Sequence, residues 1–229
     1  MHLSLPHPRQ WADAALTRIS ASGLAAPGPW GDGRRRRIGL LGGSFNPAHD
    51  GHLHVARQAR RALRLDQIWL LVSPGNPLKP AAGMAPFRQR LDSARSIADG
   101  VRVLASGLEA AIGQRYSART LARLQALFPR IRFVWIIGAD NLWQLPRWRD
   151  WRRLAARTPV AVLPRPGWTR KALRGAAASR LRHARRDPAA LLAAPGPGWA
   201  LVPAREHPAS ATALRQGGQG WPPPNSRRR

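Results

Sequence analysis

Gly42–His54 holds the densest group of residues in this sequence that could do chemistry: two glycines, a serine and the spaced histidines of His-x-Gly-His. We expect Asp50 to cap a helix that opens at Gly51, which would place His49 and His52 on one side of its first turn. The positive end of the helix dipole disfavours imidazolium, so this pair suits contact with an anion better than it suits stability. The preceding glycines would let a phosphate approach the backbone. The segment therefore predicts a phosphate-binding loop.

Two other interpretations of these histidines compete with that prediction. A single histidine at a helix start is commonly a capping or surface residue, but a pair after Gly-Gly-Ser makes this the weaker interpretation. A zinc site would need a third ligand, and apart from His54 no further His or Glu lies near His49 or His52 in the sequence. His54 points to another face of the helix, and we expect it to lie outside the site. We therefore expect no metal held by protein side chains.

Four compact apolar runs indicate strands covered on both faces, as in a parallel sheet: Ile38–Leu41, Ile68–Val72, Phe133–Ile137 and Val160–Leu163. Two shorter runs are plausible extra strands: Val101–Leu104 and Ala200–Val202. Helix-period segments accompany them: Leu53–Leu65, Phe87–Ala98, Ser117–Phe128 and Trp148–Ala155. This alternation predicts an α/β fold with a doubly wound parallel sheet, in which ligands bind beyond the carboxyl ends of the strands. The histidine pair follows such an end.

The chain of 229 residues is long enough for one domain with tails. Residues 1–33 are rich in Pro, Gly and Ala and are predicted to be a loosely ordered N-terminal extension. Residues 34–215 would form the single domain. Residues 216–229, with paired glycines, three consecutive prolines and a terminal arginine run, are predicted to be a disordered basic tail.

The composition is strongly basic, with a formal net charge of +27. Lys79 and Lys171 are the only lysines, and the joint excess of Arg, Ala, Gly and Pro is typical of a GC-rich genome, so the charge alone does not indicate nucleic acid. It does favour phosphate-bearing substrates. The chain has no cysteine, which excludes disulfides, thiolate metal sites and cysteine nucleophiles. Neither a membrane-spanning apolar run nor a signal peptide is evident, so we expect a cytoplasmic protein.

Gly42–Leu53 resembles the signature of the nucleotidylyltransferase superfamily, and the chain further resembles the bacterial nicotinate-nucleotide adenylyltransferases over residues 37–215. The other matching motifs occur in the family's order: Asn76–Lys79, Arg90, Glu109, Tyr116–Leu121, Ile137–Leu142, Trp148, Arg165–Gly167 and Ser210–Arg215. Ala209 and Ala211 depart from the family's closing Ile-Ser-Ser-Thr motif, which puts one phosphate contact in doubt.

This resemblance implies a Rossmann-like fold and transfer of the adenylyl group of ATP to nicotinate mononucleotide, with Mg²⁺ accompanying ATP. It makes His49 and His52 the catalytic residues. The implied ATP-binding residues are Gly42, Gly43, Ser44, Phe45, His49, His52, Gly138, Asp140, Ser210, Thr212 and Arg215. The implied nicotinate-nucleotide-binding residues are Asn46, Lys79, Tyr116, Ser117, Trp148, Arg149 and Arg165. Since Ser117 and Trp148 each begin a predicted helix, their free N–H groups should favour a nicotinate carboxylate over a neutral amide.

Other functions stay open as alternatives. Another adenylyl- or cytidylyltransferase, such as a phosphopantetheine adenylyltransferase, would share the first loop, but the Tyr116 and Trp148 motifs argue against it. A basic RNA-binding module would fit the charge, yet no RNA-binding motif occurs. A class I aminoacyl-tRNA synthetase also uses His-x-Gly-His, but its Lys-rich second signature is missing. We expect no membrane partner and no specific nucleic acid, and the sequence leaves the oligomeric state open.

Overall fold

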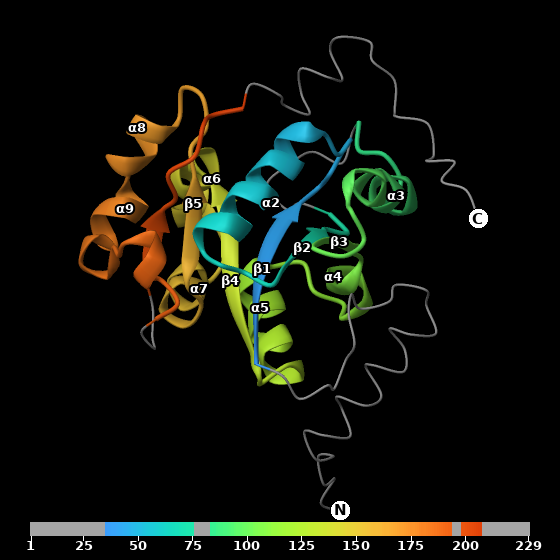
Figure 1. The fold of residues 1–229 in the computed structure, drawn as a ribbon, viewed down its shortest axis with the longest axis horizontal. Coiled ribbons are helices and arrows are strands. Elements are labelled where there is room, and N and C mark those ends of the chain that lie inside the picture. Colours follow the sequence, from blue (N-terminus) through green and yellow to red (C-terminus); the bar gives the residue numbers. More distant parts are fainter. Residues whose placement is uncertain (1–34, 76–82, 194–197, 208–229) are drawn as a thin grey trace, which may run out of the picture.

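A six-stranded parallel sheet forms the centre of the computed structural model, which describes residues 35–75, 83–193 and 198–207 (Figure 1). Its strands are β1 (Arg36–Gly43), β2 (Gln67–Val72), β3 (Val103–Ser106), β4 (Ile131–Gly138), β5 (Val160–Leu163) and β6 (Trp199–Leu201). All neighbours pair in parallel, in the order β3-β2-β1-β4-β5-β6. The doubly wound α/β prediction is thereby confirmed. The strand order reverses between β1 and β4, so the switch point lies at their carboxyl ends.

Helices cover both faces of this sheet. They are α2 (Asp50–Ala62), α3 (Phe87–Ile97), α4 (Leu108–Ala111), α5 (Ser117–Leu127), α6 (Ala139–Gln144), α7 (Trp151–Arg157), α8 (Thr169–Leu173) and α9 (Ala176–Arg180), with single 3₁₀ turns η1 (Leu145–Arg147), η2 (Arg182–Ala184) and η3 (Pro188–Ala190). Apolar residues of α2 and α3 pack on one face, and those of α5, α6 and α7 pack on the other. Figure 1 shows α2 lying across β1, close to the carboxyl ends of the central strands.

The apolar runs predicted all six strands, with one notable shift in position. β3 begins at Val103 instead of Val101, and Val101 is 68% exposed. The cause is local: one carboxylate oxygen of Asp99 accepts the backbone N–H groups of Val101, Arg102 and Val103, which holds Val101 in a turn outside the sheet. In the described ranges, no helix is long and apolar enough to cross a bilayer.

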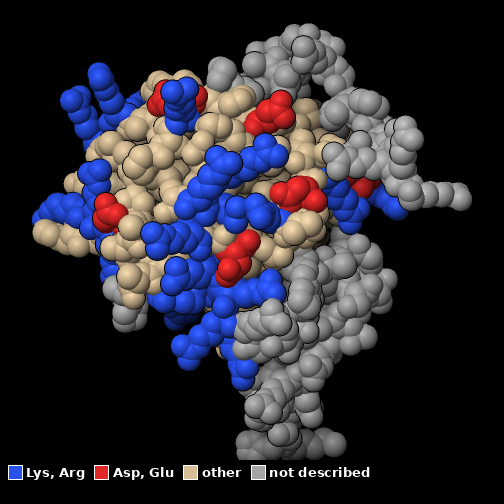
Figure 2. All heavy atoms as spheres, viewed as in Figure 1, with Lys and Arg blue, Asp and Glu red and all other residues tan. Residues whose placement is uncertain are grey.

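Basic side chains cover much of the face seen in Figure 2, with acidic ones scattered among them. The distribution follows the composition of the chain and its net charge of +27. Both predicted tails, residues 1–33 and 216–229, fall outside the described residues.

Candidate active site

His49 and His52 meet at the start of α2, directly beyond the end of β1. The helix is capped by His49, not by Asp50 as the sequence analysis expected: His49 Nδ1 accepts the backbone N–H of Gly51 at 3.1 Å, and Asp50 becomes the first helical residue. His52 Nδ1 in turn accepts the backbone N–H of His49 at 3.2 Å. The two ring centroids lie 3.9 Å apart. The predicted pairing of the two imidazoles on the first turn is therefore confirmed.

These backbone contacts determine which ring nitrogen of each histidine carries the proton. A ring nitrogen that accepts a hydrogen bond carries no proton, so a neutral imidazole bonded in this way keeps its proton on Nε2. Burial lowers the pKa of His49 to about 4, helped by the positive charges of Arg165 and His207 and opposed by Asp50. At neutral pH His49 is therefore an uncharged ring whose Nε2–H is free to donate to a ligand.

The glycines of the first loop have a different role from the one expected. A Cβ on Gly42 would lie 2.5 Å from Cη2 of Trp135, so the indole from β4 occupies the space that Gly42 leaves over β1. A Cβ on Gly43 would lie 3.2 Å from the ring of Phe45, which is buried beside the His52 ring. At both positions the missing side chain makes room for an aromatic ring of the protein itself. The expected approach of a phosphate to this backbone is therefore blocked on the Cβ side of both glycines.

The carboxyl end of β4 contributes the second half of the site. Gly138 is the N-cap of α6, and Asp140 lies in the first turn without capping the helix. A Cβ on Gly138 would collide with Asp140 Oδ1. Among the described residues, the buried side-chain polar atoms with no hydrogen-bond partner are Asp140 Oδ1 and Trp135 Nε1. Both residues line the cavity described below, where a bound water or ligand can supply the missing partner.

Aromatic and basic side chains form a third wall. Tyr116 is the N-cap of α5, and its ring lies 5.1 Å from the guanidinium carbon of Arg149 and 5.8 Å from that of Arg119. Trp148 does not begin a helix, because α7 starts only at Trp151; Trp148 follows η1 and donates its backbone N–H to the Leu145 carbonyl. Its N–H is therefore already engaged. The prediction that Trp148 begins a helix and offers a free N–H group to the nicotinate carboxylate is wrong.

One cavity of about 660 Å³ at the switch point brings the predicted residues together. The predicted residues that line it are Gly42, Gly43, Ser44, Phe45, Asn46, His49, His52, Tyr116, Ser117, Gly138, Asp140, Trp148, Arg149 and Arg165. Asn46 lines it through a side chain that also bridges the Gly83 carbonyl and the Ala85 N–H. Four predicted residues lie outside the described residues: Lys79, Ser210, Thr212 and Arg215.

Other lining residues escaped the sequence analysis: Ser73, Gly75, Arg115, Trp135, Gln144, Arg147, Trp168 and His207. Ser73 and Gly75 follow the end of β2, so the rule that sites lie beyond strand ends could have found them. Trp135 lies in the predicted buried strand Phe133–Ile137, and its 3% exposure agrees with that prediction. His207 carried no local signal.

Two buried ionisable side chains support the site, Arg90 from behind the lining loops and Glu109 on the cavity wall. The guanidinium of Arg90, 1% exposed, donates to the carbonyls of Ser44, Ser73, Pro74 and Ala85 at 2.7–3.2 Å. Glu109 accepts a 2.7 Å bond from Thr120 Oγ1, and burial raises the pKa of its carboxyl. No cluster of three His, Cys, Asp or Glu residues that could hold a metal ion occurs among the described residues.

A six-stranded parallel sheet in this order, with His-x-Gly-His beyond β1, defines a nucleotidylyltransferase, and residues 40–217 match the cytidylyltransferase-like family. Similar proteins include the probable nicotinate-nucleotide adenylyltransferase of Gluconobacter oxydans, 59% identical over 81% of this chain and 97% of the relative. That of Gluconacetobacter diazotrophicus is 55% identical over 81% and 88%. The chain belongs to the nicotinate-nucleotide adenylyltransferase family, whose enzymes act in NAD biosynthesis.

A solved structure supports the fold independently. The structure of Plasmodium falciparum nicotinic acid mononucleotide adenylyltransferase complexed with NaAD superposes with a TM-score of 0.59, covering 79% of this chain and 83% of that one at 16% identity. The same protein complexed with APC gives a TM-score of 0.57 over the same shares. At such low identity the likeness speaks for the architecture alone.

Proposed function

We propose that this chain transfers the adenylyl group of ATP to nicotinate mononucleotide, giving deamido-NAD and pyrophosphate. The observation that carries the proposal is the pair of imidazoles at the switch point, each held through Nδ1 by a backbone N–H. The family membership supports it. We also propose a cytoplasmic location, consistent with a chain that has no cysteine.

The reaction needs positioning more than it needs acid–base chemistry. A 5′-phosphate oxygen of the acceptor attacks the α-phosphorus of ATP while pyrophosphate departs on the opposite side. That oxygen is already ionised, so no general base and no covalent enzyme intermediate are required. Catalysis then depends on alignment and on donors aimed at the crowded negative charge. His49 and His52, each held through Nδ1, supply such donors through Nε2–H.

The remaining ATP contacts follow from the positions of the lining residues. Gly42, Gly43, Ser44 and Phe45 form the loop beside the histidines, and Gly138 and Asp140 lie across the switch point at the end of β4. We assign Asp140 to a ribose hydroxyl of ATP, because its buried Oδ1 is an acceptor without a partner among the described residues. Ser210, Thr212 and Arg215 are proposed to hold the β- and γ-phosphates on the strength of the resemblance alone.

The acceptor is proposed to bind on the aromatic side of the cavity. The pyridine ring would stack on Trp148, beside Tyr116 and Ser117. The first N–H groups of α5, which begins at Ser117, have no partner within the helix and suit a carboxylate. Arg149 over the Tyr116 ring adds positive charge there. Asn46, Lys79 and Arg165 complete the proposed acceptor set.

Mg²⁺ is proposed to enter with ATP. It would be carried by the phosphate oxygens and water, as suits a hard ion that dehydrates reluctantly. The described side chains fit this arrangement, since they form no three-ligand cluster of their own. When bound, the ion would neutralise charge on the departing pyrophosphate.

Pyrophosphate release from ATP, measured with a panel of mononucleotide acceptors, tests the proposal. Nicotinate mononucleotide should exceed nicotinamide mononucleotide at least about tenfold in kcat/KM, since charge-assisted hydrogen bonds exceed neutral ones by roughly 1–2 kcal/mol. Equal efficiencies would overturn the acceptor assignment but leave adenylyl transfer standing. Preference for a phosphopantetheine acceptor, or salt-dependent RNA binding without pyrophosphate release, would favour the alternative functions.

A further inference from the structure

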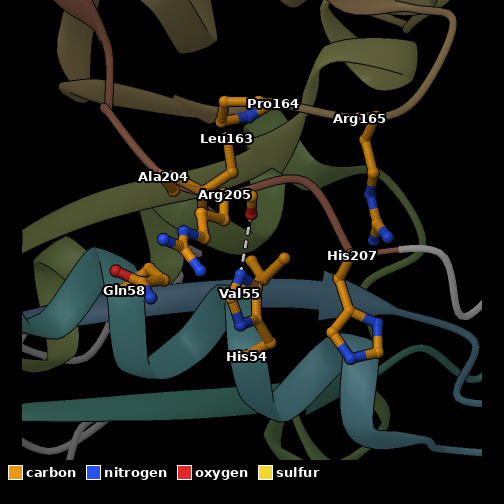
Figure 3. A pocket seen from close by; sticks show the side chains of 9 residues that line it. All are labelled: His54, Val55, Gln58, Leu163, Pro164, Arg165, Ala204, Arg205 and His207. Atoms are coloured by element: carbon orange, nitrogen blue, oxygen red, sulfur yellow. Dashed lines mark hydrogen bonds between the residues drawn. The ribbon is translucent and has the colours of Figure 1, made fainter.

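The segment that follows β6 is tied to the protein at two consecutive residues. The carbonyl of Arg205 accepts a hydrogen bond from His54 Nε2 at 2.8 Å, and Glu206 Oε1 accepts one from Thr169 Oγ1 at 2.8 Å. A carbonyl can only accept, so His54 must carry its proton on Nε2. Figure 3 shows the first tie, with the His54 ring reaching from α2 to the Arg205 carbonyl. The segment is therefore held between α2 and the beginning of α8.

These ties place His207 at the cavity. Its ring lies 5.2 Å from that of His54, and His207 lines both the small junction drawn in Figure 3 and the large cavity of the active site. Arg165 lines the same two spaces from the loop after β5. The backbone N–H of Arg165 bonds to Thr169 Oγ1 at 3.0 Å, so Thr169 connects the Arg165 loop to the His207 segment.

The corner formed by His49, His52, Arg165 and His207 is built to receive negative charge. All four line the cavity, and Arg165 forms no ion pair with any described residue. Asp50, the acidic residue nearest in sequence to the histidine pair, is exposed and does not line the cavity. Arginine and several imidazole N–H donors around one space match the oxygen atoms of a polyphosphate.

We propose that His207 is a further ligand of the ATP phosphates and that His54 positions it through the Arg205 carbonyl. The proposal rests on the proposed function, because it takes ATP as the occupant of the cavity. His54 lies two residues beyond His52, about 200° around the helix, and so faces away from the phosphates themselves. His54 therefore makes no direct contact with the site, as expected, but it acts on ATP binding by positioning His207.

The kinetic test uses the full chain and five variants: H207A, H207F, H54A, H54Q and the H54A/H207A double variant. H207F keeps a ring without donors. Both His207 variants should raise KM for ATP about three- to tenfold, the loss expected for one hydrogen bond, with KM for nicotinate mononucleotide within twofold. H54A should raise KM for ATP less. H54Q should restore it, because a glutamine amide can still donate to the Arg205 carbonyl. Gln58→Ala is the matched control, since Gln58 lines the same junction from α2 without a hydrogen bond across it.

The double variant decides whether His54 acts through His207. If it does, H54A adds nothing in the H207A background. Additive effects, or an H54Q variant no better than H54A, would overturn the positioning role. An unchanged KM for ATP in both H207A and H207F would overturn the ligand role.

Calorimetric binding of an ATP analogue whose α,β-bridging oxygen is replaced by CH₂ separates this proposal from the proposed function. The analogue cannot release pyrophosphate, so its affinity is measurable whatever the acceptor is. It should bind His207 variants about three- to tenfold more weakly than the unaltered chain, and equal affinity would sink the proposal. Inactivity of the unaltered chain with nicotinate mononucleotide would instead count against the proposed function alone. Circular dichroism melts identify any variant that fails to fold.

Discussion

The β1–α2 side and the β4–α6 side of the cavity differ in whether their buried polar atoms have hydrogen-bond partners within the protein. On the β1–α2 side, the Nδ1 atoms of His49 and His52 each accept a backbone N–H of the protein. On the β4–α6 side, Trp135 Nε1 and Asp140 Oδ1 are buried with no partner among the described residues. A buried polar atom without a partner costs about 1–3 kcal/mol. On one side the backbone already holds the Nδ1 atoms of both rings, and on the other side two buried polar atoms have no partner among the described residues.

This difference distinguishes groups that are held in place for catalysis from groups that recognise the substrate. Groups that stabilise a transition state must already be oriented when the reaction begins, so their internal hydrogen bonds help catalysis. Groups that recognise a substrate gain more by leaving a hydrogen bond for that substrate to make. The contrast suggests four experiments, from the largest expected effect to the smallest.

Replacing His52 with alanine should have the largest effect. The change removes a donor to the transition state, so kcat should fall on the order of 10²-fold or more while the fold stays intact by circular dichroism. Gln58→Ala on the same helix is a better control than a substitution of His54, because His54 holds the Arg205 carbonyl. Near-normal turnover of His52→Ala would remove the catalytic role from the β1–α2 side.

Substitutions of His49 should separate its cap from its chemistry. His49→Ala loses both, so it should lower kcat about tenfold or more and reduce stability by about 1 kcal/mol. His49→Asn should lower kcat equally but keep the melting temperature, because asparagine is a good N-cap and can accept the Gly51 N–H. Thermal melts and turnover of the two variants provide the comparison. Recovery of activity in His49→Asn would show that the cap, and not Nε2–H, is what matters.

Two buried tryptophans test the energetic cost of a buried indole N–H without a partner on the β4–α6 side. Trp199 Nε1 donates to the Leu181 carbonyl at 2.9 Å, whereas Trp135 Nε1 has no partner. Trp199→Phe breaks a bond and should reduce the free energy of unfolding by about 1 kcal/mol more than Trp135→Phe does. Trp135→Phe should instead weaken nucleotide binding a few-fold. Denaturant unfolding and substrate KM values measure the two effects, and equal destabilisation with unchanged KM would erase the contrast.

The pH dependence of stability comes last, because it leaves turnover at neutral pH untouched. The pKa of His49 falls from 6.5 to about 4 on folding, so the folded chain binds fewer protons than the unfolded chain between these values. Acidification from about pH 6.5 to about 4 should therefore favour unfolding, and stability above pH 6.5 should not depend on this group. His49→Asn should lose less melting temperature over that interval than the unaltered chain. Identical pH profiles of the two proteins would contradict the low pKa.

The sequence predicted best what depends on neighbours in the chain. Apolar runs marked every strand, and the spacing of His49 and His52 placed both rings on one helical turn, because these features depend on local periodicity. The identity of the residue that caps α2 was harder to predict. Asp50 is the better capping residue by preference, but the backbone φ and ψ of His49 are extended and bring its own Nδ1 to the Gly51 N–H.

Features that join distant segments could not be predicted. Gly42 is small because an indole from β4 lies over it, and no local pattern links Gly42 to Trp135. Trp148 resembled a helix start by its motif, yet η1 engages its N–H and delays α7. His207 reaches the cavity only because ties from α2 and α8 hold the residues before it.

Arg90 has a consequence for the motion of the loops that line the cavity. Its guanidinium joins carbonyls from the loop after β1, the loop after β2 and the approach to α3. Neither loop can swing open without leaving a buried cation short of acceptors, which is costly in the interior. The segments around Ser44 and Ser73 should therefore open together as one cooperative unit, and their amides should exchange hydrogen with a common free energy of opening. A lysine at this position, with a single nitrogen in place of the guanidinium fork, would uncouple them.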